Sequence, residues 1–539
     1  MDPYRTRAVD EAPQAPRDPG IVGDVIRQFA DPKAFYRELV QNSIDAGSPS
    51  VEIRIQHDAS AQKLRVAVRD RGEGMSRDTL ENQLLVLFRS TKETDRSKIG
   101  KFGIGFASVL APEPEVVIIQ SARDGRRMTL HLFRDLTYDL FDAGTATQAG
   151  TTVELVLAMD DSGVESFVSA SVEALVRWCR HASVPIELTW LPAAGPAQTT
   201  RIDRPLALEN AIVQVIERSA DGGAIAAVGI TPMLAPYTGF FNHGLTLHES
   251  ADSVIGCVAA KIQDSRLGHT LSRDNVRRDA AYDRAVAFAR MLATERLPRA
   301  IAAELATAAD SGNRARYRLL AAAAIYSNTA IEWRFPLVEP VGDARSIAGA
   351  ELPRRAWTSD GRSRMSALVS ASKTPVLDSV VGEIDGLVSM IEERYGCRLA
   401  RIEGELTAVT PVAPATEDTA LLACLREMLD AVGKAPSDIV IAALEGAARR
   451  AFVITGDRKA GAGGAYILDR AQTNHSPFGR LRRPPLVICV DHPLYTRARV
   501  GDPRLSASHL ARAILLEYKQ LDVETSQRLL DRTLTELLG

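Results

Sequence analysis

Residues 37–47 have the sequence RELVQNSIDAG, and this short polar run inside an apolar region decides how the first part of the chain is interpreted. On a helix, Glu38, Asn42 and Asp45 fall within about 60° of one another, because successive residues are rotated by about 100°. Apolar residues occupy most of the neighbouring positions, which predicts a helix that is at least half buried. A polar stripe of this kind is more often a solvated surface than a site, so its meaning depends on the residues that follow.

Strands are predicted wherever apolar and polar residues alternate between turn residues. The predicted strands are VEIRI (51–55), LRVAVRD (64–70), EVVIIQSA (115–122), MTLHLF (128–133), TTVELVL (151–157) and, near the C-terminus, LVICV (486–490). Together with the helix-rich stretches between them, they predict an α+β chain whose N-terminal part is an α/β sandwich.

A length of 539 residues is too great for one hydrophobic core, and the pattern predicts three domains. The predicted boundaries are 1–190 for the α/β sandwich, 191–414 for an α/β middle domain and 415–539 for a smaller α/β C-terminal domain. The stretch LPAAGPAQTTRID (191–203) is predicted to be a linker because Pro, Gly and Ala break the strand pattern. A long amphipathic helical stretch is expected at 274–309.

The overall composition, with 45% hydrophobic and 25% charged residues, is that of an ordinary globular protein. The formal net charge of −3 gives no general attraction to nucleic acid or to anionic membranes. The sequence has no run of about 18 apolar residues, and its start lacks the apolar core of a signal peptide. The five cysteines are scattered, without the spacing of a zinc site. These features predict a cytoplasmic protein whose partners include neither nucleic acid nor membrane.

Two glycine-rich segments follow the polar stripe. DRGEGMS (70–76) comes directly after a predicted strand, and its glycines allow a close approach to a planar ligand. Asp70 can accept hydrogen bonds from an exocyclic amine. In STKETDRSKIGKFGIGFASVL (90–110), glycines precede an apolar helix start, an arrangement in which backbone N–H groups bind phosphates. With Thr151 at the mouth of a later strand, the four elements form a specific combination, although each motif alone is weak.

This combination resembles the ATPase superfamily that joins gyrase, ninety-kilodalton heat-shock chaperones, histidine kinases and MutL-type repair proteins. The resemblance implies a Bergerat-type ATPase domain that uses ATP and Mg²⁺, with Glu38 as the general base that activates the attacking water. Asn42 would be the magnesium ligand, and Asp70 would bind the adenine amino group. Either Asn82 or Gln83 would lie near the sugar and phosphates. The implied nucleotide-binding set is Asn42, Asp45, Asp70, Gly74, Met75, Asn82, Gln83 and Thr151, with Lys92 in the lid and Lys101, Phe102, Gly103, Ile104, Gly105 and Phe106 in the phosphate loop.

Three later features resemble the ninety-kilodalton chaperones more than the repair proteins. GKFGIGF (100–106) is similar to the chaperone's phosphate loop. SRLGHTLSRDNVRRD (265–279) resembles the chaperone's middle domain, which implies that Arg273 stabilises charge on the terminal phosphate. The helices expected at 506–522 and 524–538 resemble the chaperone's paired dimerisation helices.

The chain also departs from that family. The lid between Ser90 and Gly100 is shorter than is usual, and RDGRRMTLHLF (123–133) replaces the family's Gly-Gly-Ser-Phe strand signature. The sequence has neither an acidic interdomain linker nor an acidic C-terminal peptide. These departures indicate a divergent, compact, bacterial-type member.

The sequence therefore predicts an ATP-dependent molecular chaperone that forms a homodimer through its C-terminal helices and binds unfolded or partly folded client proteins. Hydrolysis would need both Glu38 and Arg273. The alternative is a DNA-transaction ATPase of the MutL-type repair or chromatin-remodelling branch, which predicts basic grooves and DNA-stimulated turnover. A signalling kinase is a weaker alternative, because no phosphoacceptor histidine helix precedes the predicted ATPase domain.

Overall fold

The computed structural model of the chain divides into two compact units, Met1–Leu297 and Pro298–Gly539. The structure describes residues 31–85, 105–270, 275–362, 364–371, 374–456, 461–462, 464–469, 478 and 485–538. The α+β class is therefore confirmed, whereas the three predicted domain boundaries stay a prediction.

An eight-stranded sheet forms the centre of the first unit, with the spatial order β5-β4-β3-β6-β2-β1-β7-β8. Its strands are β1 (Val51–Asp58), β2 (Lys63–Asp70), β3 (Val116–Arg123), β4 (Arg126–Phe133), β5 (Tyr138–Thr145), β6 (Gly150–Ala158), β7 (Ile186–Leu191) and β8 (Gln198–Arg201). Neighbouring strands are antiparallel except β1 and β7, which are parallel. The five strands predicted for this region are all confirmed.

The predicted linker at 191–203 is wrong, because most of this stretch belongs to a hairpin. β8 pairs with β7 in antiparallel register, with Glu187 opposite Arg201. Ile202 continues this edge by donating its backbone N–H to the carbonyl of Ile186 at 3.0 Å. The Pro, Gly and Ala residues that suggested a linker supply the turn of the hairpin.

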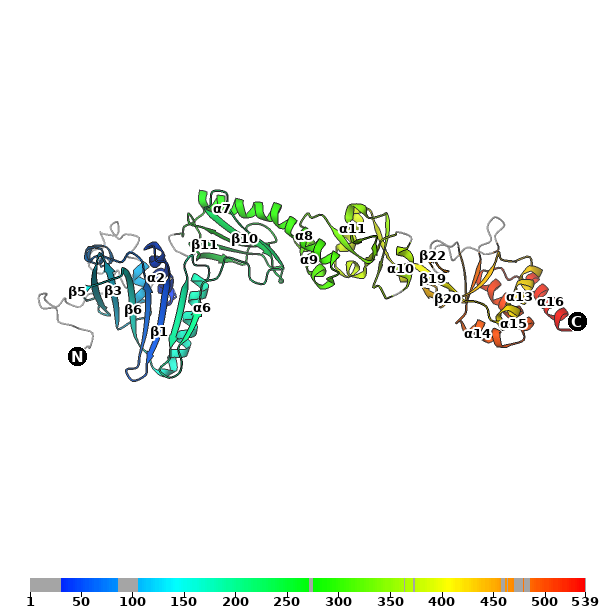
Figure 1. Cartoon of the computed structure of the whole chain (residues 1–539), viewed down its shortest axis with the longest axis horizontal. Helices are drawn as coiled ribbons and strands as arrows, with labels where there is room; N and C mark the ends of the chain where they lie inside the picture. Colours follow the sequence, from blue (N-terminus) through cyan, green and yellow to red (C-terminus); the bar gives the residue numbers. More distant parts are fainter. Residues whose placement is uncertain are drawn as a thin grey trace. The chain divides into compact units, whose positions relative to one another are not determined.

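Two helices, α2 (Ala34–Asp45) and α6 (Asp161–Cys179), pack on the eight-stranded sheet (Figure 1). The buried side chains of α2 that face the sheet are Phe35, Tyr36, Leu39 and Val40, and those of α6 are Val164, Ala174, Leu175 and Cys179. Asp160 is the N-cap of α6, and its carboxylate accepts from the backbone N–H groups of Ser162 and Gly163. The polar stripe on α2 thus lies on a helix that is held by a large core.

Three short helical turns lie near the same region: α3 (Arg77–Thr79), the π-turn η1 (Leu80–Leu84) and the 3₁₀ turn η3 (Ala107–Leu110). Ser76 caps α3 by accepting from the backbone N–H of Thr79. Leu80 and Leu84 of η1 are buried in the same core as α2, so these turns are packed parts of the fold.

A five-stranded sheet with the order β12-β11-β13-β10-β9 completes the first unit. Its strands are β9 (Val213–Arg218), β10 (Ala224–Ile230), β11 (Tyr237–Asn242), β12 (Leu245–Ser250) and β13 (Ala259–Asp264). The predicted helical stretch 274–309 is confirmed from Ala280 onward, as α7 (Ala280–Met291), a π-turn η4 (Leu292–Arg296) and α8 (Leu297–Asp310).

The end of α6 contacts the five-stranded sheet through backbone and buried polar groups. Gly244, in the turn between β11 and β12, has φ +79°, and a Cβ there would lie 1.6 Å from the carbonyl oxygen of His181. Lys261 Nζ lies 3.0 Å from His181 Nε2. Burial lowers the pKa of His181 to about 4 and that of Lys261 to about 8. At neutral pH the imidazole is therefore neutral and accepts a hydrogen bond from the ammonium group.

The second unit holds two further sheets, with the orders β15-β14-β17-β16-β18 and β21-β24-β20-β19-β23-β22. The strands are β14 (Arg334–Val341), β15 (Ala344–Ala348), β16 (Arg355–Ser359), β17 (Val376–Asp378), β18 (Arg398–Arg401), β19 (Leu406–Pro411), β20 (Ile439–Gly446), β21 (Val453–Thr455), β22 (Gly461–Ala462), β23 (Ala465–Asp469) and β24 (Leu486–Cys489). The helices are α9 (Arg314–Tyr326), α10 (Arg364–Ser370), α11 (Leu387–Tyr395), α12 (Ile402–Glu405), α13 (Thr416–Ala431), α14 (Pro493–Val500), α15 (Pro503–Glu517) and α16 (Val523–Leu538), with 3₁₀ turns η5 (Gly349–Glu351) and η6 (Ser379–Glu383).

The two terminal helices are confirmed and pack on α13. Leu510, Ile514, Leu515 and Leu529 belong to the buried core beneath them. Leu530 and Leu534, which follow one turn apart on α16, are 44% and 46% exposed. In the parts of the chain that the structure describes, no helix combines the length and the apolar character needed to cross a bilayer.

Candidate active site

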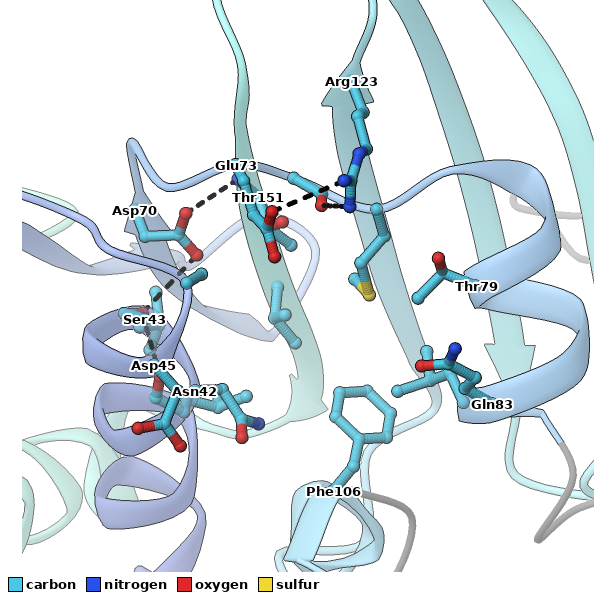
Figure 2. A pocket seen from close by; sticks show the side chains of 17 residues that line it. Asn42, Ser43, Asp45, Asp70, Glu73, Thr79, Gln83, Phe106, Arg123 and Thr151 are labelled. Carbon is cyan, nitrogen blue, oxygen red and sulfur yellow. Dashed lines mark hydrogen bonds and ion pairs between the residues drawn. The ribbon is translucent and has the colours of Figure 1, made fainter. Parts of the chain in front are cut away.

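A cavity of about 380 Å³ opens between α2, the end of β2, and the β3 and β6 strands. Figure 2 shows its polar side chains arranged around an apolar centre. The lining residues are Leu39, Asn42, Ser43, Asp45, Ala46, Val68, Asp70, Glu73, Gly74, Met75, Thr79, Gln83, Leu84, Phe106, Arg123, Thr151 and Val153. This size and this mixture of many apolar with a few polar groups are typical of a small-molecule site.

Asp70 ends β2 at one side of the cavity, and its two carboxylate oxygens have different partners. Oδ1 accepts from the backbone N–H of Gly72 at 2.8 Å and from that of Thr151 at 3.1 Å. Among the described residues, the contact of Oδ2 is a long one, 3.5 Å, with the hydroxyl of Ser43. Burial raises the pKa of the Asp70 carboxyl, and the two backbone donors oppose that shift. One oxygen is therefore held by the protein while the other can accept a hydrogen bond from a ligand.

The turn after β2 lies against neighbouring backbone with almost no space between them. Gly74 has φ +70°, and a Cβ at this position would lie 2.0 Å from the carbonyl oxygen of Ala122 in β3. A Cβ at Gly72 would lie 2.7 Å from the Cβ and carbonyl oxygen of Ala46. The two glycines of the DRGEGMS motif thus allow the turn to pack between α2 and β3. This packing places Gly74 and Met75 in the cavity wall.

The polar stripe of α2 divides between the cavity and its surroundings. Asn42 and Asp45 line the cavity, as Figure 2 shows, and Asp45 accepts from the side-chain amide of Gln41 at 3.0 Å. Glu38 lies one turn before Asn42, is half-buried and is not among the lining residues of the cavity. Glu38 is therefore positioned to contact the part of a ligand that extends out of the cavity along α2.

The opposite wall comes from the turns α3 and η1 and from Phe106. Thr79 and Gln83 line the cavity. Asn82 is exposed and donates its side-chain N–H to Asp78 at 2.7 Å, and it is not a lining residue. Of the two residues that the sequence left open, Gln83 is the one that the structure places at the cavity.

Several predicted site residues lie outside the described residues: Lys92, Lys101, Phe102, Gly103, Ile104 and Arg273. Gly105 and Phe106 are described, and Phe106 is buried against the cavity. The chain on both sides of 271–274 is described, and its two ends pair with each other. His269 forms an antiparallel β-bridge with Val276. Thr270 donates its backbone N–H to the Asn275 carbonyl at 2.9 Å and its hydroxyl to the same carbonyl at 3.3 Å.

A contact joins α2 to this segment of the chain. The guanidinium of Arg37, the residue before Glu38, hydrogen-bonds to the imidazole of His269. The same guanidinium lies 5.2 Å from the ring of Trp178 at the end of α6. The segment that precedes the predicted Arg273 is therefore in contact with the helix that carries Glu38.

Sequence reasoning missed five polar residues of the site. Ser43, Glu73, Thr79 and Arg123 line the cavity. Ser121 is not a lining residue but bonds to Met75 and Thr151, which are. Arg123 Nη2 is 3.4 Å from a carboxylate oxygen of Glu73, and Nη1 donates to the carbonyl of Gly74 at 3.4 Å. Ser121 and Arg123 are two apart on β3 and so share a face. The sequence shows that they share a face, but only the fold shows that this face meets the glycine turn at 70–76.

The residues present fit a purine nucleotide with its metal ion. The Asp70 carboxylate suits an amino donor, and Asn42 offers an amide oxygen of the kind that Mg²⁺ accepts. Among the described residues no three His, Cys, Asp or Glu side chains gather as a metal site. A magnesium ion here would therefore depend on the phosphates of the nucleotide for most of its ligands.

The class of this domain follows from a comparison with known families. Residues 34–142 match the family described as histidine kinase-, DNA gyrase B-, and HSP90-like ATPase. This part of the chain is therefore an ATPase domain of that family.

The chain is also similar to named chaperones over a part of its length. It is 28% identical over 201 residues to the chaperone protein HtpG of Nitrobacter winogradskyi, which covers 32% of this chain and 31% of the relative. It is 29% identical over 204 residues to HtpG of Rhizobium meliloti, covering 32% of each chain. With HtpG of Cupriavidus taiwanensis it shares 30% identity over 192 residues, covering 30% of this chain and 29% of the relative. The chain thus spans about a third of the length of the curated relatives that it matches.

Proposed function

We propose that this chain is an ATP-dependent molecular chaperone that hydrolyses ATP in the cavity beside α2. The observation that carries the proposal is the Asp70 carboxylate, which keeps one oxygen for a ligand at the floor of a cavity in a matched ATPase domain. The similarity to proteins named HtpG supports the chaperone role.

In this proposal the cavity residues hold the two ends of the nucleotide. Asp70, Gly74, Met75 and Thr151 contact the base, and the side-chain amide oxygen of Asn42 would hold a Mg²⁺ ion bound with the nucleotide. The metal ion supplies charge neutralisation for the phosphates when it is bound. Glu38 then orients and deprotonates the attacking water.

The activity of the purified chain tests this function. ATPase turnover is measured alone, with an unfolded client protein and with duplex DNA. A chaperone is expected to change its turnover with the client and to ignore DNA. DNA-stimulated turnover would favour the repair or chromatin branch instead, and absence of ATP hydrolysis in all three mixtures would contradict the proposal.

Arg273→Ala is expected to lower kcat by about 10- to 100-fold while the Kd for ATP stays nearly unchanged. A fully engaged arginine finger contributes about 10³ to 10⁵ in rate, and an arginine that is engaged for part of the time contributes less. Single-turnover kinetics and nucleotide titration separate the two effects. Arg278→Ala, five residues further along, is the matched control. A variant that hydrolyses ATP like the parent would remove Arg273 from the mechanism.

We also propose that α16 contributes to a homodimer interface. Leu530 and Leu534 form an exposed apolar stripe on α16, and Val523 at the start of the same helix is also exposed. The side chain of Leu537, further along the same helix, lies outside the described residues. Because Leu530 and Leu534 are not part of the buried core, they can be replaced without opening the unit's own interior.

The double variant Leu530→Glu, Leu534→Glu is expected to weaken dimerisation by on the order of 100-fold, since each leucine contributes about 1.5 kcal/mol or more when buried. Sedimentation velocity over a range of concentrations measures the change. Leu319→Glu, an exposed leucine on α9, is the control and should leave the oligomeric state alone. If the double variant sediments like the parent at every concentration, α16 is not the interface.

A further inference from the structure

A buried serine on β3 joins two parts of the cavity wall. Ser121 is 1% exposed, and its hydroxyl oxygen accepts from the backbone N–H of Met75 at 2.7 Å. The same oxygen lies 2.9 Å from Oγ1 of Thr151. Ser121 does not line the cavity itself, but both of its partners do.

The direction of the bond between the two hydroxyls follows from counting protons. A serine hydroxyl has one proton to donate. In the described part of the chain, Thr151 Oγ1 is the one acceptor within hydrogen-bond distance of Ser121 Oγ. A buried O–H without an acceptor is costly, whereas Thr151 faces the cavity and can bond to a ligand or to water there. Ser121 therefore donates to Thr151, and the proton of Thr151 is free to point into the cavity.

At the Asp70 end, the cavity then presents an acceptor and a donor beside each other. The acceptor is Oδ2 of Asp70, because Oδ1 is held by two backbone N–H groups. The donor is the hydroxyl of Thr151, which lies beside Asp70 in the view of Figure 2. Adenine offers an amino donor next to a ring-nitrogen acceptor, whereas guanine offers a carbonyl acceptor at the amino position. Asp70 Oδ2 and the Thr151 hydroxyl therefore match adenine. With guanine, Asp70 Oδ2 would face the carbonyl oxygen of the base, so that two acceptors would meet.

We propose that Ser121 is a positioning residue that fixes the Thr151 hydroxyl as a donor and thereby makes the cavity select 6-amino over 6-oxo purine nucleotides. The inference rests on the proposed function, since it takes the cavity to be the nucleotide site. Without Ser121, the Thr151 hydroxyl could rotate to accept as well as to donate, so a base with the opposite pattern would be rejected less strongly.

Titration of the full chain with ATP and with GTP measures this selectivity as the ratio of the two Kd values. Ser121→Ala is expected to lower the ratio of Kd for GTP to Kd for ATP by about tenfold, the effect of one misdirected hydrogen bond of about 1.4 kcal/mol. Ser171→Ala, a buried serine on α6 that bonds to the Phe167 carbonyl, should leave the ratio unchanged. A pocket that is merely loosened would weaken ATP and GTP together and keep the ratio, and that result would overturn the assignment.

Two further variants keep the test decisive if Ser121→Ala does not fold. Ser121→Cys keeps a weak donor of similar size and should give an intermediate ratio. Thr151→Val removes the hydroxyl while it keeps the shape, so it should lower the ratio of Kd for GTP to Kd for ATP on its own. In a chain that already carries Thr151→Val, adding Ser121→Cys should not change that ratio further. A wild-type ratio near one would overturn the inference alone, whereas a wild-type chain that binds neither nucleotide would overturn the proposed function as well.

Discussion

Asp70→Asn is expected to weaken ATP binding by on the order of 10³-fold or more, because sites that hydrogen-bond a ligand's polar group reject a mismatched partner strongly. The physical reason lies in the two carboxylate oxygens. The N–H groups of Gly72 and Thr151 both point at Oδ1, so the amide oxygen of an asparagine would take that position. The amide NH₂ would then replace Oδ2, and it would face the adenine amino group donor to donor.

The same substitution should not destabilise the nucleotide-free protein. Burial raises the pKa of Asp70 in the folded chain, which means that folding favours its neutral form. Because the folded pKa of Asp70 is raised, the carboxyl costs stability as the pH rises from its unfolded pKa through its folded pKa, and a neutral asparagine avoids this loss. Isothermal titration with ATP and a thermal melt without it measure both effects. Asp58→Asn, at the exposed end of β1, is the control and should bind ATP like the parent. Unchanged ATP affinity in Asp70→Asn would mean that the base does not bind at Asp70.

Glu38→Ala is expected to keep ATP binding and to lower kcat by about 10² to 10⁴, the usual contribution of a positioned general base. Glu38 lies outside the lining of the cavity, so its loss removes no contact to the base. Its place one turn before Asn42 puts it on the phosphate side of the proposed nucleotide.

The comparison of two Glu38 variants separates proton transfer from packing. Glu38→Gln keeps the size of the side chain but cannot accept the proton of water, so it should be as slow as Glu38→Ala. Glu165→Ala, an exposed helical glutamate on α6, should hydrolyse ATP like the parent. Single-turnover assays give the chemical step, and near-normal turnover in Glu38→Ala would exclude Glu38 as the base.

The strands could be predicted from the sequence because burial alternates along them. In β1 and β2 every second residue is buried, and this is the pattern that the sequence shows directly. β5 was missed because it is an edge strand whose last four residues are exposed and carry no alternation. The hairpin of β7 and β8 was mistaken for a linker because β8 is exposed along its whole length. The alternation of apolar and polar residues does not reveal a strand that buries little of its surface.

The site was predictable to the extent that its residues belong to recognisable motifs. The α2 stripe and the DRGEGMS turn give Asn42, Asp70 and Gly74, all of which line the cavity. Ser121 and Arg123 could not be found in this way, because their role depends on which turn β3 meets in space. The choice between neighbouring Asn82 and Gln83 depended on the rotation of a short π-turn, which the sequence does not fix.

Gly244 allows the eight-stranded sheet and the five-stranded sheet of the first unit to pack closely. A flexible tether between the ATPase sheet and the five-stranded sheet would present one to the other at an effective concentration of about millimolar, so that they would meet for part of the time. The backbone contact between Gly244 and the carbonyl of His181 replaces that search with direct packing. A β-carbon at position 244 would overlap this carbonyl and force the two backbones apart. Because glycine has only a hydrogen at this position, the two sheets can pack directly; with any larger residue they would be joined by the chain alone.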